Sequence, residues 1–193
     1  MSNPIRTIAA VSSMRSYAVC VFCASSTAID PRYLKLAAET GEAIARLDWT
    51  LVSGGGGISM MGAIAASARE HGGHTVGVIP QALVDLEVAD NQANELVVTT
   101  DMRHRKGVMD ERSDAFLALP GGIGTLEELM EVWTAHSLNM HEKPVVVLDP
   151  WGDYDLLRAQ VAHWVERGFV RPDAVARVRW VISIDEAMVA LAR

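Results

Sequence analysis

Residues 115–130 read AFLALPGGIGTLEELM, and this stretch predicts the fold of the whole chain. Its first part, residues 115–120, is short and apolar, as expected of a strand that is buried on both faces. Glycines follow at positions 121, 122 and 124, and the chain then leads into a helix that ends near Asn139. A buried strand that passes through a glycine loop into a helix is the repeating unit of parallel α/β sheets.

The same alternation of strand and helix continues on both sides of this stretch. Strands are expected over residues 17–25, 49–54, 74–80, 95–100, 115–120, 144–149 and 178–184. Helices are expected over residues 31–48, from the glycine loop 54–57 to Gly72, and over 101–113, 121–139 and 153–168. Residues 81–94 are expected to form a polar loop. The pattern predicts an α/β protein with a Rossmann-like fold, in which a parallel sheet carries helices on both faces.

The length of the chain, 193 residues, fits one domain. We expect residues 17–193 to form a single catalytic domain and residues 1–16 to form a flexible leader, in which Met14 is an alternative start. In sheets of this kind, ligands bind outside the carboxyl ends of the strands. The candidate site is therefore expected among the loops at 23–27, 53–58, 80–94 and 119–126.

Composition restricts the partners of the chain. A net charge of −7 argues against general nucleic-acid binding, which needs a basic surface to neutralise phosphates. No segment reaches the roughly 20 apolar residues that span a bilayer, so we expect no membrane partner and a cytoplasmic location. Cys20 and Cys23 lie three residues apart in a predicted strand and point to opposite faces, which favours buried thiols over a disulfide or a zinc site.

Two glycine loops lead from a strand into a helix, and each has two interpretations. Glycines let backbone N–H groups approach an anion closely at a helix N-terminus, so both loops fit a phosphate site. The first loop, Gly54, Gly55, Gly56 and Gly57, lacks the Lys-Ser/Thr end of a P-loop and the third glycine of a dinucleotide fingerprint. It fits a tight strand–helix turn equally well. The second loop, residues 121–125, adds the hydroxyl of Thr125.

The carboxylate of Glu128 also has two interpretations. Thr125 followed three residues later by Glu128 is the pattern of a capping box, in which each side chain bonds the backbone N–H of the other residue. Glu127 would then only interact with the helix dipole. The same carboxylate is held at the ligand edge of the sheet, where the helix terminus favours its ionised form and suits it to catalysis.

A basic cluster, MRHRK at 102–106, starts another helix directly after a strand. A charge run of this kind is usually a solvated helix face, but its position at the ligand edge favours a functional role. The planar fork of Arg105 suits a phosphate or a developing anion, and Lys106 adds a point charge. Glu87 is a carboxylate in the loop after the third strand and fits either an ordinary loop residue or a ligand contact.

Taken together, PGGIGTLEE (120–128), MRHRK (102–106) and SGGGGISMMG (53–62) resemble the Lonely Guy family of phosphoribohydrolases, whose members are often labelled lysine decarboxylases. The resemblance extends to VCVFCASS near the start, GVIP at 77–80 and EVWTAHSLNMHEKPVVVLD at 131–149, and so covers about residues 17–170.

The resemblance implies hydrolysis of cytokinin riboside 5′-monophosphates, and in some members AMP, to the free base and ribose 5-phosphate. It implies Arg105 and Glu128 as the catalytic pair, and Glu87 and Thr134 as substrate-binding residues. Further substrate contacts are expected from both motifs: Met102, Lys106, Gly121, Gly122, Ile123, Gly124, Thr125, Leu126 and Glu127. It implies a homodimer, with a hexamer as the alternative, and a small-molecule nucleotide as the substrate. We expect the reaction to need no metal and no cofactor.

Three positions depart from the usual family pattern. Ala24 replaces a glycine, Ile123 a common tyrosine and Ser137 a common glutamine, which leaves the preferred base open between an isopentenyl-type cytokinin and plain adenine. A non-catalytic nucleotide-binding or carrier protein of the same fold is the alternative to the enzyme. A true lysine decarboxylase is disfavoured, because no sequence context for a pyridoxal lysine is present.

Overall fold

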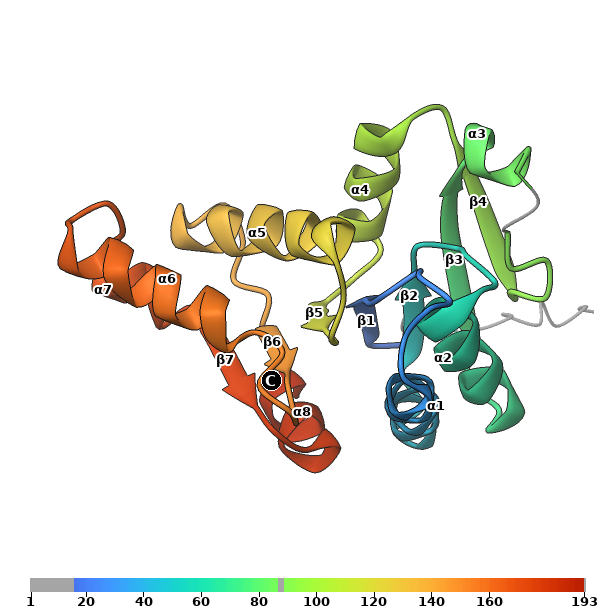
Figure 1. Ribbon diagram of the computed structural model, residues 1–193. Helices are drawn as coiled ribbons and strands as arrows, with labels where there is room; N and C mark the ends of the chain where they lie inside the picture. Colours follow the sequence, from blue (N-terminus) through green and yellow to red (C-terminus); the bar gives the residue numbers. More distant parts are fainter. Residues whose placement is uncertain (1–15, 87–88, 193) are drawn as a thin grey trace, which may run out of the picture.

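The computed structural model describes residues 16–86 and 89–192 (Figure 1). The predictions for the leader before Ser16, for Met14 and for Glu87 lie outside these residues. The described strands form one seven-stranded sheet in which every pairing is parallel. The predicted α/β class and Rossmann-like fold are therefore confirmed.

The elements follow the predicted order with shorter strands. The strands are β1 Ala18–Phe22, β2 Thr50–Ser53, β3 Thr75–Pro80, β4 Glu95–Thr99, β5 Ala115–Ala118, β6 Val145–Leu148 and β7 Val178–Val181. The helices are α1 Pro31–Arg46, α2 Ser59–Glu70, α3 Gln81–Val84, α4 Met102–Glu111, α5 Ile123–Ser137, α6 Asp155–Glu166, α7 Pro172–Val175 and α8 Ile184–Leu191. The short helices α3 and α7 were not predicted, because four residues are too few to show a helical repeat. The C-terminal helix α8 was not predicted either.

The order of the strands in the sheet is β4-β3-β2-β1-β5-β6-β7. The chain builds outward from β1 in one direction as far as β4, and then returns to the other side of β1 with β5. The direction of winding reverses between β1 and β5, and ligands in open α/β sheets bind at this switch point. The loops that leave β1 and β5 are thus the expected walls of a site.

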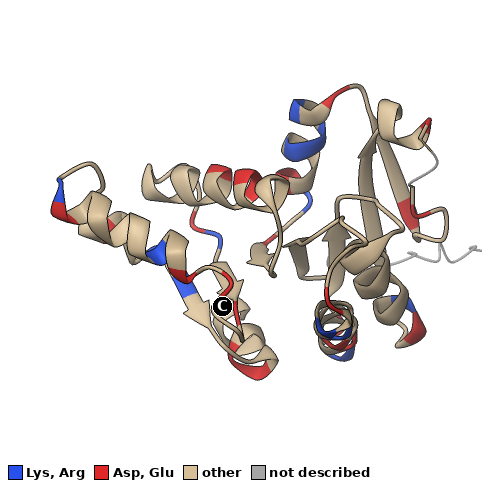
Figure 2. Cartoon of the chain, viewed as in Figure 1, with Lys and Arg blue, Asp and Glu red and all other residues tan. Residues whose placement is uncertain are grey.

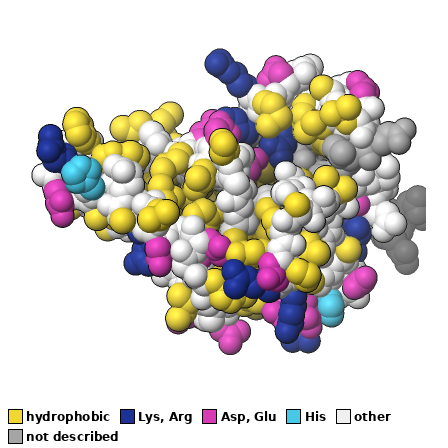
Figure 3. Space-filling model, viewed as in Figure 1, with side chains coloured by type: hydrophobic (Ala, Val, Ile, Leu, Met, Phe, Trp, Pro, Cys, Tyr) yellow, Lys and Arg dark blue, Asp and Glu magenta, His cyan; other side chains and the backbone are white. Residues whose placement is uncertain are grey.

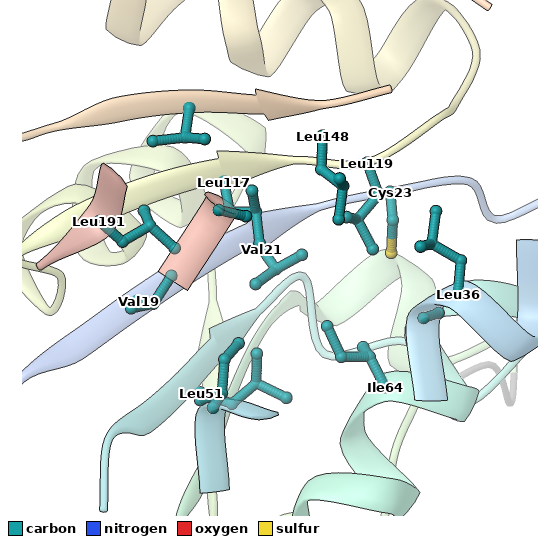
Figure 4. Packing of buried hydrophobic residues seen from close by; sticks show 14 of the residues in the cluster. Val19, Val21, Cys23, Leu36, Leu51, Ile64, Leu117, Leu119, Leu148 and Leu191 are labelled. Atoms are coloured by element: carbon teal, nitrogen blue, oxygen red, sulfur yellow. The ribbon is translucent and has the colours of Figure 1, made fainter. Parts of the chain in front are cut away.

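Hydrophobic side chains fill both faces of the sheet. On one face, Val19, Val21 and Leu117 pack with the helices α1, α2 and α8, as Figure 4 shows. On the other face, Cys20 and Phe116 pack with residues of α4, α5 and α6. Burial on both faces explains the continuous apolar runs of the strands.

The cysteines follow the predicted alternation of the first strand. Cys20 belongs to one cluster and Cys23 to the other, and both are buried free thiols. Burial raises the pKa of each thiol, because the thiolate is poorly solvated there. Their role as structural thiols is therefore confirmed.

Local sequence sets the helix starts that border the site. The Asp30 side chain accepts a hydrogen bond from the Arg32 N–H, with Pro31 in the first turn of α1, as predicted. Asp101 caps α4 by accepting from the N–H groups of Arg103 and His104 at 2.8 and 2.9 Å.

Within the described ranges, none of the helices is long and apolar enough to cross a bilayer.

Candidate functional site

The four predicted loops line one cleft at the carboxyl edge of the sheet. Its volume is about 460 Å³. It is lined by residues 23–26, by the first glycine loop with α2, and by the start of α5. Leu83 of α3 and Met102 of α4 also border it. The prediction that these loops meet around a ligand-sized space is confirmed.

An ion pair between two helices lies at the inner end of this cleft. Arg105 of α4 donates from Nη1 to Oε1 of Glu128 on α5 at 2.7 Å. Their side chains are only 8% and 12% exposed. The Nε–H of Arg105 also donates to the carbonyl of Val78 at 3.0 Å, which fixes the plane of the guanidinium. The two residues that the resemblance pairs are therefore in direct contact, and Arg105 does not belong to a solvated face.

The capping box predicted for Thr125 and Glu128 is wrong. Helix α5 begins two residues before Thr125, with Gly122 as its N-cap, and the Leu126 N–H donates to the Gly122 carbonyl at 3.0 Å. Thr125 is therefore inside the first turn and cannot cap it. The carboxylate of Glu128 is directed to Arg105 and not to a backbone N–H group, because a buried charge is stabilised best by a partner of opposite charge.

The environment of Glu128 also corrects the expected direction of its pKa. Burial raises the pKa of this carboxyl above its ordinary value, and the charge of Glu127 adds to the rise. The Arg105 guanidinium opposes this by Coulombic attraction and by its hydrogen bond. Desolvation outweighs both, so the pKa of Glu128 is raised, and its ionised form is not favoured as the sequence suggested.

The first glycine loop makes room for Arg105. A Cβ atom at Gly54 would lie 1.9 Å from Nη2 of Arg105, so no larger residue fits while the guanidinium keeps its place. Gly55 has a φ of +72° and packs against the backbone of Val78, and a Cβ at Gly57 would meet the carbonyl oxygen of Ala89 at 3.2 Å. Of the two interpretations for this loop, the tight turn accounts for these three glycines.

The second glycine loop divides into a packed and an open part. A Cβ at Gly121 would overlap the side chain of Thr125, with Oγ1 at 2.2 Å. A Cβ at Gly122 or at Gly124 would meet no atom within 4 Å. Packing therefore requires only the first of these glycines, and the other two keep the wall of the cleft open beside the start of α5.

The segment after β3 is tied to the first glycine loop. The Asp90 N–H donates to the Gly55 carbonyl at 2.8 Å, and Ala89 forms an isolated bridge with Gly56. Arg69 of α2 holds the Asp90 carboxylate at 2.6 Å. These contacts place the end of the segment that contains Glu87 beside the cleft, although Glu87 itself lies outside the described residues.

Several predicted substrate contacts lie elsewhere. The residues of the cleft include Met102, Gly122, Ile123, Gly124, Thr125 and Glu127, as predicted. Gly121 instead lines a neighbouring cavity, and Leu126 packs into the core. Lys106 lines a separate cavity between α4 and α5, and Thr134 lines a groove between α5 and α6.

The cleft also contains side chains that the motifs did not indicate. One wall is apolar and is formed by Ile58, Met61, Ile79, Leu83 and Met102. Of these only Met102 was predicted as a contact, because the others come from separate elements and carry no polar signal in the sequence. Ala24 and Ile123, two of the departures from the family pattern, border the cleft, whereas Ser137 does not.

Known proteins resemble this chain along most of its length. Residues 61–191 match the model of a family described as "Possible lysine decarboxylase". A cytokinin riboside 5′-monophosphate phosphoribohydrolase of Mycobacterium marinum is 51% identical over 91% of this chain and 94% of its own. Its counterpart in Mycobacterium tuberculosis is 50% identical over the same shares. The chain belongs to the Lonely Guy family.

Plant members and more distant structures extend the comparison. The Lonely Guy enzyme LOG1 of Arabidopsis thaliana is 42% identical over 81% of this chain and 73% of its own. The molybdenum cofactor binding protein of Rippkaea orientalis has a TM-score of 0.70 at 23% identity, covering 92% of this chain and 96% of its own. At that identity the likeness supports the fold of the Lonely Guy chain and nothing about its ligand.

Replacing Gly54 tests the packing of Arg105. We expect Gly54→Ala to lower the free energy of unfolding by about 2 kcal/mol or more, because the guanidinium must move and Glu128 loses its buried partner. Urea unfolding measures the change. Gly107→Ala, in the same helix as Arg105 and with open space at its Cβ, is the matched control and should not destabilise the protein. Equal stability of Gly54→Ala and wild type would contradict this account.

Proposed function

We propose that the protein hydrolyses cytokinin riboside 5′-monophosphates to the free base and ribose 5-phosphate. The curated relatives that are 50–51% identical carry this name. The observation that carries the proposal is the buried Arg105–Glu128 pair at the inner end of a cleft whose wall is a helix N-terminus.

The open start of α5 suits the 5′-phosphate. The first N–H groups of a helix have no intrahelical acceptor and carry a positive partial charge, so they bind anions. Here they belong to Ile123, Gly124 and Thr125, and the glycines at 122 and 124 leave the approach free of side chains. A phosphate bound there would leave the ribose between the loop and Glu128.

Glu128 and Arg105 would act on the bond between ribose and base. As this bond breaks, the ribose develops positive charge, as in other glycoside hydrolysis. The ionised carboxylate of Glu128 would stabilise that charge or activate the water. The hydroxyl of the water goes to C1′ and its proton to the departing base. Arg105 would orient the substrate and stabilise the departing base.

The apolar wall supports a substituted base. Five of the residues that line the cleft are apolar side chains from α2, β3, α3, α4 and the loop before α2: Ile58, Met61, Ile79, Leu83 and Met102. Apolar walls with a few placed polar groups are typical of small-molecule sites. Such a wall would receive the purine ring and an apolar substituent on it, which favours a cytokinin nucleotide over plain AMP.

Product analysis tests the reaction. Chromatography should show free base and ribose 5-phosphate from a cytokinin riboside 5′-monophosphate, less release from AMP, and none from the matching riboside without phosphate. Glu128→Gln and Arg105→Ala should each lower kcat/KM by about 100-fold or more, since each removes charge stabilisation of the transition state.

An exposed glutamate provides the matched control for these variants. Glu39→Gln on α1 removes a carboxylate that pairs with Lys35 outside the cleft, and it should hydrolyse at the wild-type rate. Release of base at wild-type rates by both Glu128→Gln and Arg105→Ala would overturn the mechanism. Stable binding of the nucleotide by the wild-type protein without release of base would favour the nucleotide carrier instead.

The pKa of Glu128 predicts a pH dependence. The carboxylate must be ionised to stabilise positive charge, and burial raises its pKa, so kcat/KM should fall on acidification at a pH above the ordinary range of a glutamate. A pH–rate profile measures this. Glu127→Gln removes the neighbouring negative charge and should move the acidic limb to lower pH, whereas Glu39→Gln should not. An acidic limb at or below the ordinary glutamate range would contradict the assignment.

We also propose that the protein is a homodimer that uses the α5–α6–α7 face. Figure 3 shows hydrophobic side chains gathered over this part of the molecule. Leu138 is 61% exposed and Phe169 is 76% exposed. Exposed apolar groups that lie together indicate an interface.

The two buried cysteines are free thiols, which supports a reducing, cytoplasmic location.

Sedimentation measures the state of association. The wild-type protein should sediment at twice the chain mass of 20.9 kDa. Phe169→Asp should shift it toward the monomer, because a charge cannot be buried unpaired in the interface. Val189→Asp on α8 is the control with the same 76% exposure and should remain dimeric. A monomeric wild type would overturn the dimer and leave the proposed reaction untouched.

A further inference from the structure

We propose that Lys106 and Glu131 are positioning residues that clamp α4 against α5 and hold the Arg105–Glu128 pair in register. Lys106 acts through this clamp and does not touch the substrate, and Glu131 is a functional residue that no motif indicates. The proposal rests on the proposed hydrolysis.

The clamp consists of one ammonium group and two carboxylates. Nζ of Lys106 binds Oε2 of Glu131 at 2.6 Å and also binds Oε1 of Glu127. The two glutamates are one helical turn apart on α5, so a single lysine reaches both. Figure 2 shows the acidic part of α5 beside α4, which carries the basic residues. The hydrogen bonds to the two carboxylates raise the pKa of Lys106 and keep it charged.

Lys106 lies on the far side of the catalytic pair. It does not border the cleft that contains Arg105 and Glu128. Together with Glu131 it lines a separate, mostly apolar cavity of about 210 Å³ that includes Met109 and Phe116. Glu128 borders both spaces, and the contact of Lys106 with the cleft runs through the carboxylate of Glu127. Geometry thus separates Lys106 from the place where the phosphate is expected.

The clamp and the catalytic pair are adjacent in both helices. Lys106 follows Arg105 directly in α4, and Glu127 precedes Glu128 directly in α5. Any rotation or slide of α4 that breaks one pair therefore shifts the other. Misplacement of a catalytic group by about 1 Å costs on the order of 100-fold in rate. A contact that fixes the two helices relative to each other therefore affects kcat strongly.

The clamp also governs charge at the cleft. Glu127 borders the cleft near the start of α5, where its negative charge would oppose a bound phosphate. The ammonium of Lys106 offsets that charge from behind. Both glutamates are 52% exposed on their side chains, so the clamp contributes little to global stability, and its effect falls on the geometry of the site.

Glu131→Gln separates positioning from binding. It removes the contact between Lys106 and Glu131 and leaves the contact between Lys106 and Glu127 in place. We expect kcat to fall by about fivefold or more and KM to stay within about twofold, since alignment is lost and the phosphate site is kept. Lys106→Met should lower kcat at least as much, and the double variant should be no worse than Lys106→Met, because Lys106→Met already breaks the contact to Glu131. Lys106→Arg should restore most of kcat.

Glu95→Gln is the matched control. Glu95 pairs with Arg112 at the other end of α4, is 39% exposed on its side chain and lies away from the cleft. It should leave kcat and KM unchanged. Glu131→Gln at wild-type kcat would show that the Lys106–Glu131 contact positions nothing, and would overturn the proposal.

Hydrogen exchange of the α5 backbone gives a readout that does not depend on the reaction. Glu131→Gln and Lys106→Met should both speed exchange in α5, and Glu95→Gln should not. Unchanged exchange in both variants would overturn the clamp. A wild-type protein that releases no base, but shows these exchange effects, would overturn the proposed hydrolysis and leave the clamp standing.

Discussion

The guanidinium of Arg105 is a charged group that is almost fully buried at the cleft, and the site is built around the partners that it requires. It bonds the carbonyl of Val78 and the carboxylate of Glu128, and it fills the space that a side chain at residue 54 would take. An unpaired charge in this position would be strongly destabilising. The contacts from β3, α4, α5 and the first glycine loop therefore depend on one another.

The topology of the sheet explains how these elements meet. Because the winding reverses between β1 and β5, the loops that follow them diverge to opposite faces and leave a crevice at their carboxyl ends. Helix α4 follows the outermost strand of one half and α5 follows the first strand of the other. The buried ion pair thus joins the two halves of the sheet across the crevice, where a ligand would be held.

The two glycine loops show that similar sequences can serve different physical needs. Glycines 54, 55 and 57 are required by neighbouring atoms, and Gly54 makes room for the side chain of Arg105. In the second loop only Gly121 is packed, and Gly122 and Gly124 face open space at a helix N-terminus. Glycine content alone could not separate these cases, because the distinction depends on which atoms of distant segments approach each Cα.

The sequence by itself determined the order of strands and helices, the parallel sheet, the edge where the site lies and the motifs that hold Arg105 and Glu128. These features follow from local periodicity, chain connectivity and short motifs. Only the tertiary structure decided that Glu128 bonds Arg105 and not the backbone near Thr125, and that the pKa of Glu128 is raised. It also decided that Lys106 lies outside the cleft. Each of these depends on burial and on the distance between α4 and α5, and such quantities arise from packing between segments that local sequence does not encode.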